Sequence, residues 1–153
     1  MPEKKYIVNS ILIDAQPAAI WNVLTNPEQT KKYMFGCETV SDWQKGSDLF
    51  WQMSYEGKDI IAVKGTITSI ETDKMLAYTV IDPNNQAIAD IPENYLMVTY
   101  CITKENECQL LTVTQGNYAT VADGEKRYNE AYNNGQGWMP ILNEIKKIAE
   151  CGN

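Results

Sequence analysis

Histidine is absent from this sequence, and arginine occurs only once, at Arg127. Without histidine, the histidine-based catalytic triads, the commonest general base and the usual zinc ligand sets are excluded. A single arginine, a net charge of −7 and the lack of a long lysine run leave no cationic surface for nucleic acid or for an anionic membrane. We therefore expect no metal, no other cofactor and no nucleic-acid partner.

Long apolar segments are also lacking. No stretch approaches the roughly 20 residues of a membrane-spanning helix, so membrane insertion is not expected. The N-terminus, Met1–Ser10, has no apolar core followed by a small-residue cleavage site. The four cysteines, Cys37, Cys101, Cys108 and Cys151, form no CxxC pair and no metal-ligand cluster. These features favour a cytoplasmic protein whose cysteines are reduced and structural.

Most of the chain before residue 120 shows the alternation of apolar and polar residues that is typical of β-strands. The pattern predicts strands over Tyr6–Asp14, Cys37–Val40, Asp48–Tyr55, Lys58–Glu71, Lys74–Asp82, Glu93–Thr103 and Cys108–Asn117. Two short helices are expected after the first strand, beginning near Pro17 and Pro27, because proline suits the first turn of a helix. Gly65, in the middle of a strand, indicates a bulge or bend that lets the sheet curl.

The pattern changes to that of one long helix from Asp123 to Asn153. Apolar residues recur there at spacings of three and four, which places them on one helix face. They are Trp138, Ile141, Leu142, Ile145, Ile148 and Ala149. The first half of this helix is expected to be looser, because two glycines and Pro140 weaken its hydrogen bonds.

The 153 residues fit one domain, 1–153, of the α+β class, in which a curved antiparallel sheet wraps around the C-terminal helix. Such a sheet leaves room for an apolar cavity beside the looser half of the helix. We expect the sheet to line it with Trp51, Met53, Tyr55, Val63, Tyr78, Val98, Tyr100, Val113 and Gln115, and the helix with Tyr128, Tyr132, Gly135 and Met139. The alternative for each tyrosine is a core position with its hydroxyl satisfied by neighbours or water.

Four segments carry a resemblance to a known family. They are Ala15–Glu28 (AQPAAIWNVLTNPE), Val40–Ser47 (VSDWQKGS), Lys64–Ile70 (KGTITSI) and Gly137–Lys146 (GWMPILNEIK). Together they resemble the START-like (SRPBCC) superfamily, and within it the activator-of-heat-shock-ATPase (Aha-type) homologues. The resemblance covers nearly the whole chain and implies the helix-grip fold. This branch has no shared catalytic signature that could be carried over to particular residues here.

Three functions remain open at this point. The favoured one is binding of a small hydrophobic or amphipathic ligand in the cavity between sheet and helix. The resemblance implies an alternative, a chaperone-ATPase activator that acts through protein contacts. A homodimer also stays open, because Trp21 lies off the apolar stripe of its helix. A second alternative, which the resemblance to the START-like superfamily also suggests, is a cyclase- or hydrolase-like enzyme that works through tyrosine hydrogen bonds. Catalysis is less favoured because no catalytic residue is evident and nothing near Cys101 would lower its pKa.

Overall fold

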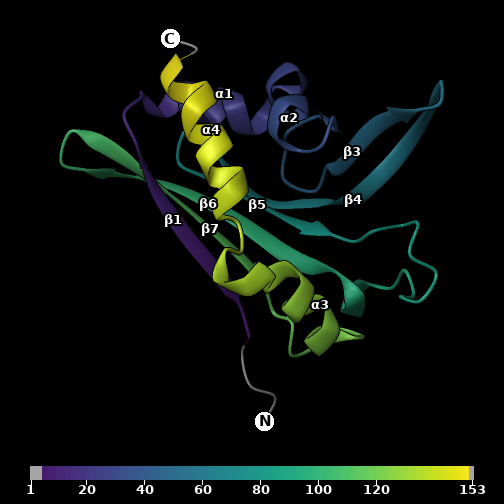
Figure 1. Ribbon diagram of the computed structural model, residues 1–153. Coiled ribbons are helices and arrows are strands. Elements are labelled where there is room, and N and C mark those ends of the chain that lie inside the picture. The colour runs from purple at the N-terminus through teal and green to yellow at the C-terminus, as the bar shows by residue number, and fades with distance from the viewer. Residues whose placement is uncertain (1–4, 152–153) are drawn as a thin grey trace.

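One antiparallel sheet of seven strands forms the body of the computed structural model, which describes residues 5–151 (Figure 1). The strands are β1 (Ile7–Ile13), β2 (Glu38–Ser41), β3 (Asp48–Tyr55), β4 (Lys58–Glu71), β5 (Met75–Val80), β6 (Leu96–Glu105) and β7 (Cys108–Gly116). Their order across the sheet is β1-β7-β6-β5-β4-β3-β2. The predicted α+β architecture with a curved antiparallel sheet is confirmed.

The sheet turns at β4, which pairs with β3 along its first part and with β5 along its last part. Register shifts leave Ala62 and Thr68 as extra residues on β4, and such bulges bend and twist a sheet. Gly65 lies between them, where a Cβ atom would stand only 1.5 Å from the carbonyl oxygen of Thr79. The predicted bend is therefore built from two bulges and a glycine that allows close backbone approach.

Two short helices, α1 (Pro17–Thr25) and α2 (Pro27–Tyr33), follow β1 as expected. Each begins with a proline, and the Asn26 side-chain oxygen caps α2 by accepting a 3.0 Å hydrogen bond from the Glu28 amide. The Tyr33 hydroxyl donates a 2.8 Å hydrogen bond to the carbonyl oxygen of Val23, which ties the two helices together. Both helices contact the C-terminal helix, α4 (Met139–Cys151).

The C-terminal region is not the single long helix that the sequence predicted. It consists of α3 (Gly124–Tyr132), the short 3-10 helix η2 (Asn133–Gly135) and α4, while the predicted end at Asn153 lies outside the described residues. Asn133, Asn134 and Gly135 have φ angles of 49°, 55° and 90°, which a right-handed helix cannot contain. The expected weakening by Pro140 does not occur, because this proline lies in the first turn of α4.

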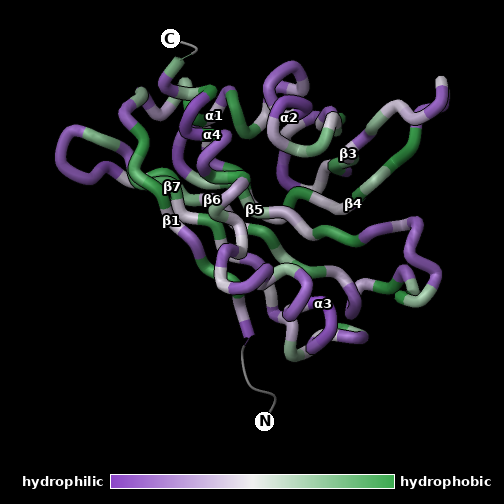
Figure 2. Tube along the Cα trace, viewed as in Figure 1, coloured by the Kyte–Doolittle hydropathy of each residue, from purple (hydrophilic) through white to green (hydrophobic). Residues whose placement is uncertain are grey.

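The core lies between the sheet and the helices α1 and α4. Its fully enclosed members come from all of these elements and include Ile13, Ile20, Leu24, Leu111, Leu142 and Ile145. Hydrophilic residues dominate α3, whereas hydrophobic residues recur along the strands (Figure 2). The α4 helix lies across one face of the sheet, and α3 lies at the other end of that face (Figure 1). Within residues 5–151, no helix combines the length and the apolar character needed to cross a membrane.

Candidate functional site

A pocket of about 300 Å³ opens on the helix-bearing face of the sheet, and we call it the main pocket. Six of the predicted site residues line it, namely Trp51, Met53, Val63, Tyr78, Val98 and Gln115. Six further residues complete the lining, namely Met34, Phe35, Cys37, Ala62, Val80 and Trp138. None of the twelve side chains carries a charge. Larger hollows, on the surface of α3, over Lys64 and Asp90, and beside Asp73 and Lys104, are lined largely by charged and polar residues.

Strand pairing explains why the predicted residues from β5, β6 and β7 meet. Tyr78 pairs with Val98, and Val98 pairs with Gln115, so these three side chains form one row across three neighbouring strands. Tyr100 and Val113 belong to the next row on the same face, two residues farther along their strands. Both are almost completely buried and do not line the main pocket.

Tyr55 does not reach the main pocket, although it was predicted to follow Trp51 and Met53 on one face of β3. Its side chain is 58% exposed near the tip of the β3–β4 hairpin, which extends beyond the neighbouring strands (Figure 1). The bulge beside Trp51 places its extra residue, Ala62, on β4, so the alternation along β3 continues to Met53 and only the position of Tyr55 at the hairpin tip removes it from the pocket.

The predicted residues of the C-terminal region lie elsewhere as well. Tyr128, Tyr132 and Gly135 line a separate hollow of about 280 Å³ beside β1, and Met139 packs against the core. The reason is the break between α3 and α4, which directs α3 away from the main pocket. The cavity that the sequence placed beside the first half of a long helix is instead bounded by Trp138 and by the α2–β2 connection.

Trp138 is held in the pocket wall by three contacts. Its backbone amide donates a 2.9 Å hydrogen bond to the Asn9 side-chain oxygen, and its indole nitrogen donates one of 3.0 Å to the Gln115 side-chain oxygen. Its ring packs edge-on against Tyr100, with centroids 5.9 Å apart. The preceding Gly137 has a φ of 50°, and a Cβ atom there would lie 2.5 Å from the Asn9 oxygen. Only glycine therefore lets the chain approach β1 closely enough for these bonds.

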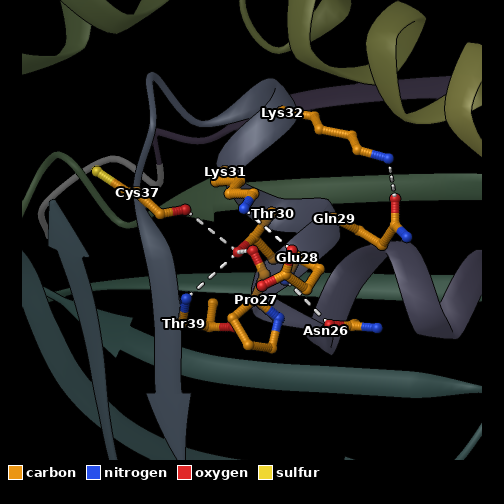
Figure 3. A network of polar contacts seen from close by, with 9 residues as sticks. All are labelled: Asn26, Pro27, Glu28, Gln29, Thr30, Lys31, Lys32, Cys37 and Thr39. Atoms are coloured by element: carbon orange, nitrogen blue, oxygen red, sulfur yellow. Dashed lines mark hydrogen bonds and ion pairs between the residues drawn. The ribbon is translucent and has the colours of Figure 1, made fainter.

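The α2–β2 connection contributes Met34, Phe35 and Cys37 to the pocket lining, and Thr30 anchors it (Figure 3). The Thr30 hydroxyl accepts a 3.2 Å hydrogen bond from the Thr39 amide and can donate to the carbonyl oxygen of Cys37 at 3.2 Å. Thr30 is completely buried, so these bonds are shielded from water. Between the anchored ends, the Phe35 side chain is 84% exposed and its φ is 55°. No site residue was predicted in this segment, because period-two patterns identify only strand residues.

Burial controls the protonation of the polar groups near the pocket. It is the largest cause of the raised pKa values of Tyr33, Tyr78 and Tyr100, so all three hydroxyls keep their protons beyond the pH at which an ordinary tyrosine ionises. The neighbouring Tyr78 hydroxyl reduces the shift at Tyr100 in part. Within residues 5–151, the Tyr100 hydroxyl is enclosed without a well-formed hydrogen bond.

Cys37, which lines the pocket, also has its pKa raised by burial and is therefore a neutral thiol. Among the described residues, no group of three or more cysteine, aspartate or glutamate side chains is arranged to hold a metal ion. The chemistry that this site offers is thus apolar contact together with hydrogen bonds from neutral donors.

The sheet order, the paired helices after β1 and the terminal helix define a START-like protein with the helix-grip fold. The family model described as Activator of Hsp90 ATPase homolog 1-like protein matches residues 14–150. The chain belongs to this family, which confirms the resemblance carried by the four sequence segments.

Solved structures agree with this assignment. The chain is 32% identical to ChR145 from Cytophaga hutchinsonii, with 97% of this chain and 96% of that chain covered and a TM-score of 0.72. MLL2253 from Mesorhizobium loti is 17% identical, with 97% and 99% covered and a TM-score of 0.71. The Aha1 dimer from Colwellia psychrerythraea is 16% identical, with 97% and 98% covered and a TM-score of 0.66. The last two similarities show the fold alone. A comparison with curated protein sequences found no match.

Proposed function

We propose that the protein binds a small hydrophobic or amphipathic molecule in the main pocket, with the cytoplasm as its place of action. The observation that carries this proposal is a pocket of about 300 Å³ with an uncharged, mostly apolar lining. Pockets that hold small molecules span roughly 300 to 1,000 Å³ and combine apolar walls with a few polar groups. The volume therefore favours a compact guest over a long lipid chain.

The lining suits guests of varied shape. Met34 and Met53 line the pocket from the α2–β2 connection and from β3, and methionine adapts to irregular surfaces. Trp51 and Trp138 add large rigid surfaces against which a planar guest can pack. The gain in affinity comes from removing apolar surface of both partners from water.

The proposal is tested by thermal unfolding in the presence of a library of small apolar and amphipathic compounds. A ligand at a hundredfold excess over its Kd adds about 2.7 kcal/mol to the free energy of unfolding. Val80→Trp places a large ring in the pocket, while Val8→Trp places it at a side chain that is 57% exposed on β1. Ligands should stabilise the wild type and Val8→Trp but not Val80→Trp. Failure of every compound to stabilise the wild type would refute the proposal.

A second candidate function is activation of a heat-shock ATPase through protein contacts. Family membership and the likeness to the Colwellia psychrerythraea Aha1 structure favour it. Under this hypothesis, the protein forms a complex with purified Hsp90 and raises its rate of ATP hydrolysis. An unchanged rate at saturating protein would count against this function and would leave ligand binding untouched.

Self-association is a related proposal, because the Colwellia psychrerythraea relative is described as a dimer. The outward side chains of β1 offer apolar surface for it, since Val8 and Leu12 are 57% and 46% exposed. Sedimentation of the wild type and of Val8→Lys measures the proportions of monomer and dimer in each protein. A monomeric wild type over the micromolar range would exclude a stable dimer.

Catalysis by tyrosine remains the third prediction. The raised pKa values of Tyr78 and Tyr100 make their hydroxyls hydrogen-bond donors and poor bases, which restricts the mechanism to orientation and polarisation of a bound molecule. Turnover that disappears in Tyr78→Phe while ligand binding persists would support it.

A further inference from the structure

We infer that the main pocket selects uncharged ligands that carry an acceptor oxygen, and that the side-chain amide of Gln115 is the group that binds this oxygen. This inference rests on the proposed function and adds the chemical class of the ligand. Its basis is the hydrogen bond between Gln115 and Trp138 together with the uncharged lining of the pocket.

The hydrogen bond to Trp138 fixes which end of the Gln115 amide is free. An indole nitrogen can only donate, so the atom that faces it at 3.0 Å must be the side-chain oxygen Oε1. The amide nitrogen Nε2, with two hydrogens, therefore points away from Trp138. Gln115 is half-buried in the pocket lining, and a donor in that position is best satisfied by an acceptor atom of the guest.

The Tyr78 hydroxyl, a further polar group of the lining besides the Trp138 indole and the Cys37 thiol, is also a donor. The Tyr78 hydroxyl is kept protonated by burial, and Tyr78 stands in the same row as Gln115, separated from it by Val98. Neighbouring strands lie about 4.8 Å apart, so the two residues are about 10 Å apart along the row. A compact guest can thus place one oxygen near Gln115 and extend along the row towards Tyr78.

The lining disfavours ionic guests. It contains no lysine or arginine that could pair with a carboxylate, and no aspartate or glutamate that could pair with an ammonium group. Transfer of an unpaired charge from water into such surroundings is strongly unfavourable, whereas a carbonyl group that gains a hydrogen bond is tolerated. Neutral ketones, esters, amides and phenols with apolar bodies fit this description.

Three probes of nearly the same shape test the inference at pH 7. They are 2-acetylnaphthalene, which has a carbonyl acceptor, 2-ethylnaphthalene, which has none, and 2-naphthoate, which is an anion. Equilibrium dialysis should give the acetyl compound a Kd about threefold to tenfold lower than the ethyl compound, because a net hydrogen bond changes affinity by that factor. The naphthoate should bind most weakly.

Variants of Gln115 identify the group responsible. Gln115→Glu, measured at pH 8 to keep the carboxylate ionised, can still accept the Trp138 hydrogen bond but has no donor for the guest. Gln115→Leu lacks both functions. Each should bring the ratio of the acetyl and ethyl Kd values to one or reverse it. Gln109→Leu is the control, because Gln109 lies on β7 outside the main pocket and should keep the wild-type ratio.

The outcomes distinguish a failure of the Gln115 assignment from a failure of ligand binding in the main pocket. Equal binding of the acetyl and ethyl compounds, tightest binding of naphthoate, or a ratio unaffected by Gln115→Glu would overturn the inference and leave the proposed pocket function standing. Failure of all three probes to bind would overturn the inference and also count against the pocket function itself. A threefold or larger preference that disappears in both Gln115 variants supports the assignment.

Discussion

The indole nitrogen of Trp138 donates a 3.0 Å hydrogen bond to the Gln115 side chain and thereby joins the start of α4 to β7. The same ring packs edge-on against Tyr100 and forms part of the main pocket. Trp138 is thus a packing residue and a pocket residue at once. Its neighbour Gly137 supplies the left-handed turn that brings it there.

Replacement of Trp138 should separate these roles. Trp138→Ala removes a side chain that is only 8% exposed, and we expect it to lower the free energy of unfolding by about 3 to 5 kcal/mol. Trp138→Phe keeps an aromatic ring but loses the hydrogen bond, so its cost should be smaller. Urea unfolding followed by circular dichroism measures both. A loss below about 1 kcal/mol in Trp138→Ala would contradict the packing role.

Two buried tyrosines make a matched pair for a second prediction. The Tyr33 hydroxyl bonds to the Val23 carbonyl oxygen at 2.8 Å, whereas the Tyr100 hydroxyl is enclosed without a well-formed hydrogen bond among the described residues. Tyr33→Phe should cost about 1 kcal/mol or somewhat more, because the Val23 oxygen loses its partner. Tyr100→Phe should be neutral or stabilising by up to about 1 kcal/mol. Urea unfolding of the two variants tests the pair, and a clear loss of stability in Tyr100→Phe would contradict the prediction and point to a favourable contact of that hydroxyl with its neighbour Tyr78.

The close backbone approach at Gly65 gives a third prediction. A methyl group there would stand 1.5 Å from the Thr79 carbonyl oxygen, so Gly65→Ala must separate β4 from β5 and should cost about 3 kcal/mol or more. Gly46→Ala is the control, because it has open space around it and only a φ of 90° to oppose a side chain. Its cost should be about 1 to 2 kcal/mol. Equal losses in the two variants would show that the strands can part freely at Gly65.

Strand and turn signals allowed much of the fold to be predicted from the sequence. The bounds of β3 and β4 agree with the prediction, and α1 and α2 begin at the predicted prolines. The C-terminal helix was predicted too long. Asn133, Asn134 and Gly135 are residue types that tolerate positive φ, and this run was the signal that could have revealed the break.

The site was harder to predict than the fold. Period-two patterns identify which strand residues share a face, and Tyr78, Val98 and Gln115 were found in this way. The rest of the lining comes from segments that meet the sheet only after folding, such as the α2–β2 connection. Trp138 was correctly placed on the apolar side of the C-terminal region. Its position in the pocket lining could not be predicted, because it depends on the break that precedes α4.

Alkaline pH provides the last prediction. The pKa values of Tyr33, Tyr78 and Tyr100 are raised by burial, and burial also raises the pKa of Tyr118 to about 12. An unfolded chain ionises its tyrosines near pH 10, so above that pH the unfolded state binds fewer protons than the folded state. Stability contributed by these groups is complete below about pH 10 and falls as pH rises towards their folded pKa values. For Tyr118 this window runs from about pH 10 to about pH 12.

Each such tyrosine steepens the fall by up to about 1.4 kcal/mol per pH unit. Urea unfolding at pH 8, 9.5 and 11 measures the slope, and tyrosine absorbance at 295 nm reports ionisation directly. Tyr100→Phe removes one buried hydroxyl and should make the fall of the free energy of unfolding with pH shallower by up to about 1.4 kcal/mol per pH unit. Tyr55→Phe, at a side chain that is 58% exposed, is the control and should leave the slope unchanged. The same slope in wild type and Tyr100→Phe would mean that Tyr100 ionises as readily in the folded protein as in the unfolded chain, which is incompatible with its burial.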